Sequence, residues 1–92
     1  MAEEEIEYPI NGELDLHTFL PAEVKDLLPE YIRACREKGI LQIRVIHGKG
    51  TGTLRRLVHS ILEKQPAALN WWEEGGSGGG WGATIVQLKA MN

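Results

Sequence analysis

Residues 40–62 read ILQIRVIHGKGTGTLRRLVHSIL, and this stretch decides the fold. Its first seven residues, 40–46, are rich in β-branched side chains and short enough for a strand that is buried on both faces or nearly so. Thr53 is expected to cap a helix, because apolar residues recur at helical spacing from Leu54 to Leu62. The stretch therefore predicts a buried strand, a glycine-rich turn and a helix that packs on the sheet.

The flanking segments extend this unit to the order β-α-β-α-β-β. Residues 13–17 and 83–89 alternate polar and apolar side chains, and residues 69–73 form a further candidate strand. An apolar stripe at helical spacing follows Pro21, and Pro29 is expected to kink or split that helix. We expect an α/β fold with a mixed four-stranded sheet and two helices, in which two βαβ crossovers produce parallel neighbours.

The bulk composition fits one small globular domain. The chain has 92 residues, of which 42% are hydrophobic and 25% are charged, and these values are ordinary for a folded protein. The net charge is −3, but four of the thirteen acidic residues fall within the first seven positions, so the remainder carries nine acidic and ten basic residues. We expect residues 1–12 to form an acidic, mobile N-terminal arm and residues 13–92 to form the domain.

The cysteine count and the hydropathy pattern restrict the setting of the protein. Cys35 is the only cysteine, which excludes an internal disulfide and favours a reducing, cytoplasmic compartment. On its apolar stripe it is expected to behave as a small core hydrophobe. The acidic start differs from the basic start of a secretory signal, and no apolar run approaches the roughly 18–20 residues of a membrane helix. We expect no membrane role.

Two histidines stand at the ends of the first two predicted strands. In a parallel α/β sheet the functional crevice lies at the carboxyl ends of the strands, so His17 and His47 are expected to meet there with Asp15. Asp15 could orient a catalytic base or bind a metal, or it could only fix the tautomer of His17 or cap the glycine turn. His47 could be catalytic or could only hold the turn by a hydrogen bond. His59 is expected on the outer face of the second helix, as a surface residue.

The turn before the second helix suits an anion. Its three glycines lead to a helix N-terminus, where free N–H groups and the positive end of the helix dipole attract phosphate. The glycine spacing matches neither the Walker loop nor the dinucleotide-binding loop, which argues against nucleotide cofactors. A cationic rim of this turn would suit a phosphodiester backbone, although solvated surface side chains are the alternative. The rim consists of Lys49, Arg55 and Arg56.

Three segments resemble, in order and spacing, the three motifs of the Smr (small MutS-related) domain family. They are Leu14-Asp15-Leu16-His17, His47-Gly48-Lys49-Gly50 and Gly79-Gly80-Trp81-Gly82-Ala83-Thr84, within a match that spans residues 14–89. Thr18 follows the first motif where much of the family has glycine. The resemblance implies a two-layer α/β sandwich similar to the C-terminal domain of translation initiation factor 3.

The resemblance also implies a function in nucleic-acid processing, by nicking DNA or cleaving structured RNA, linked to DNA repair or recombination. It marks Asp15, His17 and His47 as the catalytic candidates. Trp81 lies among glycines and is a candidate for stacking on an unpaired base, in a loop that closes over the substrate or is merely a flexible hairpin. The candidate residues for nucleic-acid binding are Gly48, Lys49, Gly50, Thr51, Arg55, Arg56, Gly80 and Trp81.

The metal requirement is left open by the sequence, and no organic cofactor is expected. One carboxylate with two histidines is a poor cage for Mg²⁺, so Mg²⁺ or Mn²⁺ at Asp15 is one alternative. RNA could be cut without a metal, because its 2′-hydroxyl can attack with one histidine as base and the other as acid. DNA cleavage needs an activated water. A non-catalytic module for branched or structured nucleic acid and a protein-interaction adaptor are the alternatives to a nuclease.

Overall fold

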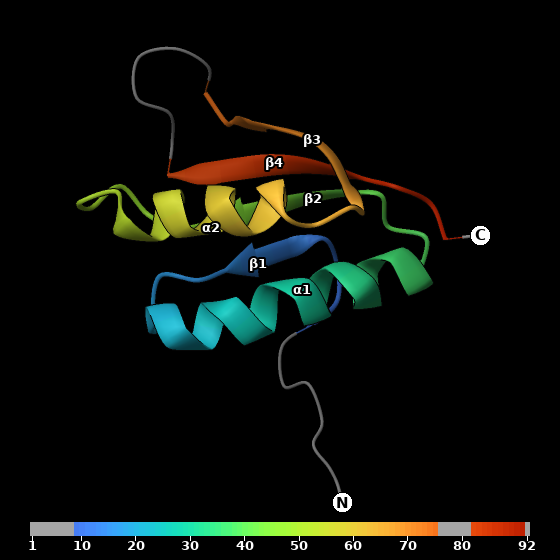
Figure 1. The fold of residues 1–92 in the computed structure, drawn as a ribbon, viewed down its shortest axis with the longest axis horizontal. Coiled ribbons are helices and arrows are strands. Elements are labelled where there is room, and N and C mark those ends of the chain that lie inside the picture. The colour runs from blue at the N-terminus through green and yellow to red at the C-terminus, as the bar shows by residue number, and fades with distance from the viewer. Residues whose placement is uncertain (1–8, 76–81, 92) are drawn as a thin grey trace, which may run out of the picture.

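The computed structural model of the chain describes residues 9–75 and 82–91. Within them it has four strands and two helices in the order β1-α1-β2-α2-β3-β4 (Figure 1). Their bounds are Glu13–Asp15 (β1), Pro21–Glu37 (α1), Gln42–Ile46 (β2), Thr53–Glu63 (α2), Ala68–Glu73 (β3) and Ala83–Leu88 (β4). The prediction of a mixed four-stranded sheet with two helices is confirmed.

The strand order across the sheet is β1-β2-β4-β3. β1 and β2 are parallel neighbours, as expected for the first crossover. The same expectation is wrong for the second crossover, because β4 lies between β2 and β3 and runs antiparallel to both. The chain returns directly from β3 into β4, so β4 pairs with β3 along one edge and offers its other edge to β2.

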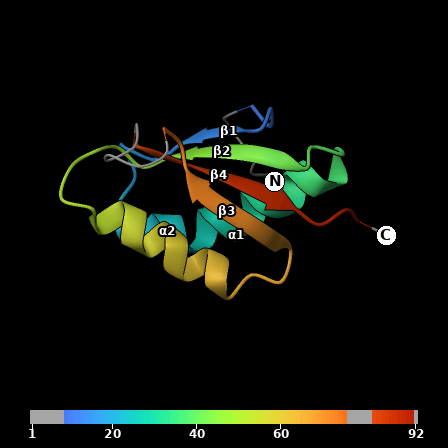
Figure 2. The same ribbon diagram turned by 90° about the horizontal axis from the view of Figure 1, so that it is seen from above.

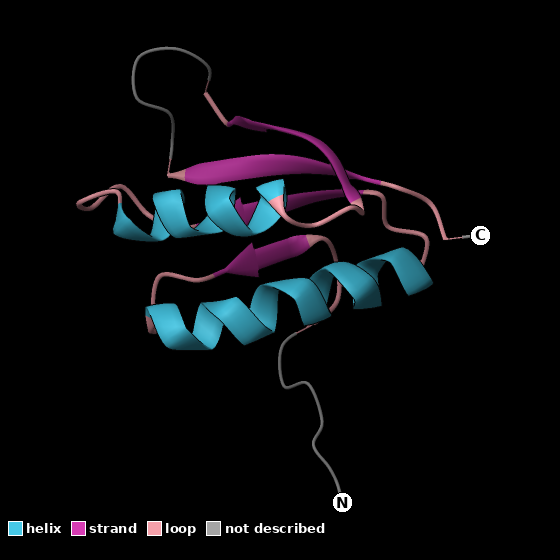
Figure 3. Ribbon diagram, viewed as in Figure 1, coloured by secondary structure: helices cyan, strands magenta, loops and turns pink. Residues whose placement is uncertain are grey.

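Both helices lie on one face of the sheet, which gives the fold two layers (Figure 2). Figure 3 shows the helices in cyan along one side of the magenta strands. The helices also pack against each other. The side chains of β4 alternate accordingly: Thr84, Val86 and Leu88 are buried, whereas Gln87 is exposed. The helices bury Val24, Leu28, Tyr31, Ile32, Cys35, Val58 and Leu62 in the same core.

α1 begins and continues for reasons that lie in its sequence. Pro21 occupies the first helical position, and the carboxylate of Glu23 accepts a hydrogen bond from the backbone N–H of Leu20 at 2.8 Å. The helix remains a single element across Pro29, so the expectation of a split is wrong. The buried stripe on both sides of Pro29 holds the two halves on the same core, and this outweighs the hydrogen bond that proline cannot make.

Burial also confirms the expectation for Cys35 and bears on the N-terminal arm. Cys35 is a free, fully buried thiol, and burial raises its pKa. Residues 1–8 of the expected arm lie outside the described residues. Of the rest of that segment, Ile10 packs against the core and Gly12 is buried. Residues 9–12 therefore extend the packed domain on its N-terminal side.

The other face of the sheet carries an ion-pair network on Arg44. Its guanidinium contacts Glu13 at 2.7 Å and Glu74 at 2.9 Å. Because Arg44 belongs to β2, Glu13 to β1 and Glu74 follows β3, the network ties these three strands together across the open face. Trp72 and Ile85 are paired neighbours in β3 and β4, and Ile85 is also paired with Arg44.

Tyr31 anchors the entry to β1. Its hydroxyl oxygen accepts a hydrogen bond from the backbone N–H of Gly12 at 3.0 Å, and its side chain is fully buried. Burial raises the pKa of Tyr31 to about 12. The contact fixes the start of the strand that leads to Asp15 and His17.

We expect Tyr31→Phe to lower the free energy of unfolding by about 1–3 kcal/mol, because the buried N–H of Gly12 loses its acceptor. The Tm should fall by roughly 4–8 °C per kcal/mol for a domain of this size. Thermal and urea unfolding would measure the change. Unaltered stability at an unchanged urea m-value would contradict the anchoring role.

Candidate functional site

The ends of three strands meet at one edge of the sheet. β1 and β2 run in parallel, so both leave the sheet at this edge, and β4 enters it there because it is antiparallel to β2. The backbone N–H of Leu16 donates to the carbonyl of Ile46 at 2.7 Å and continues the pairing beyond β1. This places the segment after Asp15, the segment after Ile46 and the segment before Ala83 side by side.

A close backbone contact joins the second and third of these segments. The carbonyl of Gly82 accepts hydrogen bonds from the backbone N–H groups of both His47 and Gly48, each at 2.8 Å. A Cβ atom on Gly82 would lie 3.0 Å from the carbonyl carbon of Gly48, and Gly82 has a φ of +83°. Both the contact and the backbone conformation therefore require glycine at this position.

Asp15 and His17 form an exposed pair beside this contact. Nδ1 of His17 lies 2.6 Å from Oδ1 of Asp15, and the same oxygen accepts the backbone N–H of His17 at 3.0 Å. These two hydrogen bonds lower the pKa of Asp15. The side chains of His17 and Asp15 are 63% and 50% exposed, so the pair is open to solvent. A Cβ atom on Gly48 would lie 4.0 Å from Cβ of His17, which places the pair next to the glycine turn.

The ring of this exposed histidine has a defined polarity. The carboxylate of Asp15 accepts a hydrogen bond, so Nδ1 of His17 carries the hydrogen and Nε2 of the neutral ring is left as an acceptor. Among the described residues, none bonds Nε2. The arrangement is the one in which a carboxylate orients a histidine as a base.

His47 has a different environment, because it is buried. Its Nδ1 lies 3.2 Å from the carbonyl oxygen of Gly48, and its Nε2 lies 2.9 Å from the hydroxyl of Thr84. Burial lowers the pKa of His47, and the hydrogen bond to Gly48 opposes that shift. The structure thus brings His47 to the same sheet edge as Asp15 and His17, with both ring nitrogens engaged within the protein.

His59 is the residue that the sequence pattern misplaced. It is half-buried, and its Nε2 lies 3.0 Å from the same hydroxyl of Thr84, so the expectation of a surface residue is wrong. Its ring is edge-on to that of His47, with centroids 6.4 Å apart, and burial lowers its pKa. On α2 it lies four residues after Arg55 and three before the buried Leu62, which is the spacing of one helical face.

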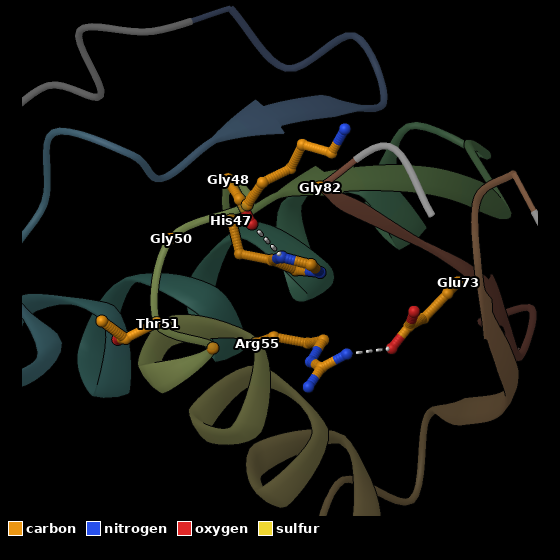
Figure 4. Close-up of a pocket in the computed structure, with 9 residues that line it drawn as sticks. His47, Gly48, Gly50, Thr51, Arg55, Glu73 and Gly82 are labelled. Carbon is orange, nitrogen blue, oxygen red and sulfur yellow. Dashed lines mark hydrogen bonds and ion pairs between the residues drawn. The ribbon is translucent and has the colours of Figure 1, made fainter. Parts of the chain in front are cut away.

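A pocket of about 190 Å³ opens next to these residues (Figure 4). Arg55 reaches across it from α2, and its guanidinium contacts the carboxylate of Glu73 at the end of β3, with 3.0 Å between Nη1 and Oε2. Neither Glu73 nor its pairing with Arg55 was expected from the sequence. The lining consists of His47, Gly48, Lys49, Gly50, Thr51, Gly52, Arg55, Glu73 and Gly82.

The N-terminus of α2 forms one wall of this pocket. The N-cap is Gly52, with a φ of +90°, and not Thr53, which begins the helix. The hydroxyl of Thr51 lies 2.8 Å from that of Thr53, so a side-chain pair replaces the expected cap. The first turn of α2 contains no acidic residue, and its N–H groups lack intrahelical acceptors. Arg56 is exposed on the same turn.

Some sequence-based candidates are not described by the structure. Gly80 and Trp81 lie outside the described residues, so the proposed stacking role stays a prediction. In the described ranges, 9–75 and 82–91, no group of three or more His, Cys, Asp or Glu side chains is arranged to hold a metal ion. Neither of the two helices there is long and apolar enough to cross a membrane.

The sequence was compared with known families and proteins. The family model of the Smr domain matches residues 14–89. The chain belongs to the Smr domain family. The match contains both segments that build the sheet edge as well as Thr84 and His59, so the site described above lies within the Smr domain.

Two relatives are named Endonuclease MutS2. The one from Thermomicrobium roseum is 36% identical over 80 residues, which cover 87% of this chain and 10% of the relative. The one from Halothermothrix orenii is 43% identical over 67 residues, which cover 68% of this chain and 8% of the relative. The chain thus spans about a tenth of the length of these proteins.

Two solved structures share the fold. The Smr domain of Thermus thermophilus MutS2 superimposes with a TM-score of 0.77 at 29% identity, covering 86% of this chain and 99% of that one. YdaL, a stand-alone small MutS-related protein from Escherichia coli, gives a TM-score of 0.77 at 24% identity, covering 90% of this chain and 68% of that one. The two-layer arrangement of this Smr domain is therefore that of solved Smr structures.

The contact between Gly82 and Gly48 leads to a stability prediction. Gly82→Ala is expected to lose more stability than Gly39→Ala, since both glycines have a positive φ, which costs alanine about 1–2 kcal/mol, but only Gly82 meets another backbone. Gly39 has a φ of +79°, and a Cβ atom added there would meet nothing within 4 Å, so it is the matched control. Thermal unfolding of both variants would measure the difference, and equal losses would contradict the close contact.

Proposed function

We propose that this Smr domain is an endonuclease that nicks DNA or cleaves structured RNA. The observation that carries the proposal is the Asp15–His17 pair, an exposed imidazole oriented by a carboxylate at 2.6 Å beside the glycine turn. The name of the two MutS2 relatives supports the same class of reaction, for the tenth of their length that this chain spans.

The pocket is suited to a phosphate group of the backbone. The N–H groups of the first turn of α2 supply donors and the positive end of a helix dipole, and Lys49 and Arg55 add cationic side chains to the lining. A phosphate there would lie close to Gly48, and Gly48 is next to His17. We infer that Gly48, Gly50 and Thr51 contact the backbone phosphate, with Arg56 at the rim.

His17 has the geometry of a general base. Its Nε2 is an acceptor in the neutral ring and the carboxylate of Asp15 stabilises the imidazolium that forms after proton uptake. On RNA the base would activate the 2′-hydroxyl, and on DNA it would activate a water molecule. The pocket donors would stabilise the charge that develops on the phosphate oxygens. Where Mg²⁺ or Mn²⁺ takes part, Asp15 is the ligand that we propose.

A second function remains in competition, a non-catalytic module for branched or structured nucleic acid. It is favoured by the two internal hydrogen bonds of His47, which occupy both ring nitrogens and suit a residue that holds the glycine turn. Under this function the phosphate contacts persist and Asp15 is dispensable. In either case we propose a role in DNA repair or recombination, in the reducing cytoplasm that suits the free thiol of Cys35.

Cleavage by variants of the exposed pair separates the two functions. We expect Asp15→Asn and His17→Ala to lower the rate of cleavage by about 10²–10⁴-fold, the usual contribution of a positioned acid–base group. Supercoiled plasmid and a labelled structured RNA would be the substrates, each with Mg²⁺, Mn²⁺ or a chelator. Asp26→Asn, at an exposed acidic residue of α1, is the control and should cut like the wild type.

The outcome of that assay decides between the classes. Cutting that is indifferent to both substitutions, or absent while binding persists, would exclude the endonuclease and leave the binding module. A 2′,3′-cyclic phosphate on RNA that forms in the presence of the chelator would exclude a metal-activated water for that substrate.

The Arg55–Glu73 pair leads to a binding prediction. We expect Glu73→Gln to raise the affinity for structured DNA by up to roughly fivefold at low salt, because a partly exposed ion pair of about 0.2–1 kcal/mol no longer competes with the phosphate. The salt dependence of binding should become steeper. Glu74→Gln is the matched control, since it changes the net charge equally but removes a partner of Arg44. Equal gains in fluorescence anisotropy titrations would contradict the prediction.

A further inference from the structure

A chain of three buried or half-buried polar side chains runs beneath the pocket, and the proposed function does not use all of it. The hydroxyl oxygen of Thr84 lies 2.9 Å from Nε2 of His47 and 3.0 Å from Nε2 of His59. Thr84 is fully buried and His47 is 6% exposed. A hydroxyl shared by two imidazoles in the core has a cost in desolvation, so its hydrogen bonds have to be made in one consistent pattern.

Counting hydrogens defines that pattern. The carbonyl of Gly48 can only accept, so Nδ1 of His47 carries the hydrogen of the neutral ring. Nε2 of His47 is then an acceptor, and the hydroxyl of Thr84 is its donor. That hydroxyl has a single hydrogen, so Nε2 of His59 has to donate to the oxygen of Thr84. Every hydrogen in the chain is assigned, and the direction of donation runs from His59 through Thr84 to His47.

We propose that His59 and Thr84 are positioning residues that hold His47 as a neutral imidazole with its hydrogen on Nδ1. His47 then presents an N–H donor at the glycine turn, and His17 is left as the base; this assignment of roles rests on the proposed function. His47 lines the pocket, and the 3.2 Å from Nδ1 to the Gly48 carbonyl is a long hydrogen bond. An oxygen of a bound phosphate can therefore share or take that donor.

The surroundings of both rings agree with neutral histidines. Burial is the largest influence on each ring and lowers the pKa of both. The charged groups that act on His59 are Arg55 and Glu63 on α2 and Glu73 on β3, with Arg55 opposing protonation and the two carboxylates favouring it. For His47, His59 and Arg55 oppose protonation while Glu73 favours it.

The tautomer of His47 can be read directly from the ¹⁵N shifts of its ring in the 92-residue chain, without any substrate. We expect the wild type to carry hydrogen on Nδ1 and an unprotonated Nε2. Thr84→Val and His59→Leu should shift both nitrogens toward the average of two tautomers, because the hydroxyl is removed or is free to reverse. Thr84→Ser, which keeps a hydroxyl, and His59→Gln, which keeps a side-chain N–H, should restore the wild-type shifts.

Two results would overturn the proposal. One is a wild-type His47 with its hydrogen on Nε2, a measurement that does not depend on the folding of any variant. The other is a folded His59→Leu variant whose His47 shifts equal those of the wild type.

The cleavage assay supplies a separate readout. In the wild-type background we expect His59→Leu to lower kcat by roughly 10- to 100-fold, as removal of a partner that orients a metal-binding histidine does, with KM little changed. His59→Gln should recover most of that loss. A His59→Leu variant with an altered tautomer and an unchanged kcat would overturn the role of His47 in the reaction. If the wild type cuts nothing, the endonuclease fails, while the ring shifts still decide the positioning role.

Discussion

The carbonyl of Gly82 holds the site together. By accepting the N–H groups of both His47 and Gly48, it closes the end of β2 onto the start of β4 without room for a side chain. His47 is thereby turned toward Thr84, two residues beyond Gly82, and the glycine turn leaves the sheet in the direction of α2. The pocket, the exposed Asp15–His17 pair and the buried histidines all depend on this contact, because each includes or adjoins one of the two glycines.

The two pairs of polar groups at this edge experience different dielectric environments. Asp15 and His17 are half-exposed or more, so water screens their interaction and the ring nitrogen that faces solvent is available to a substrate. His47 and His59 lie under the turn, where a misplaced hydrogen leaves a buried group unsatisfied. The same residue type can therefore serve as a base at one position and as a fixed donor at the other, within one sheet edge.

Much of the fold was accessible from the sequence, since its signals are local. Period-two alternation and the helical apolar stripes predicted all six elements within a few residues, and the first crossover predicted the parallel pair β1–β2. The insertion of β4 between β2 and β3 could not be read in the same way, because it depends on which edges pair and not on any pattern within one strand. The helical split at Pro29 failed for a related reason, as tertiary burial outweighed a local signal.

The site shows the same division between local and distant information. Asp15, His17 and His47 could be placed at one edge because strand ends are local features. The depth of His59 depends on β4, which lies 25 residues away at Thr84. The role of Glu73 depends on Arg55, 18 residues earlier. Gly52 replaces Thr53 as the cap because the turn needs a positive φ, a demand that only the three-dimensional path of the loop reveals.

The position of β4 in the sheet has a consequence for the order of folding. β4 follows β3 in the chain but lies between β2 and β3, so during synthesis β3 has no neighbour to pair with until residues 83–88 have emerged. The parallel pair β1–β2 with α1 can form earlier, whereas Gly82 and Thr84 arrive only with β4. The chemistry of the site is thus completed at the last step of sheet assembly, and a chain that stops before β4 lacks its pocket.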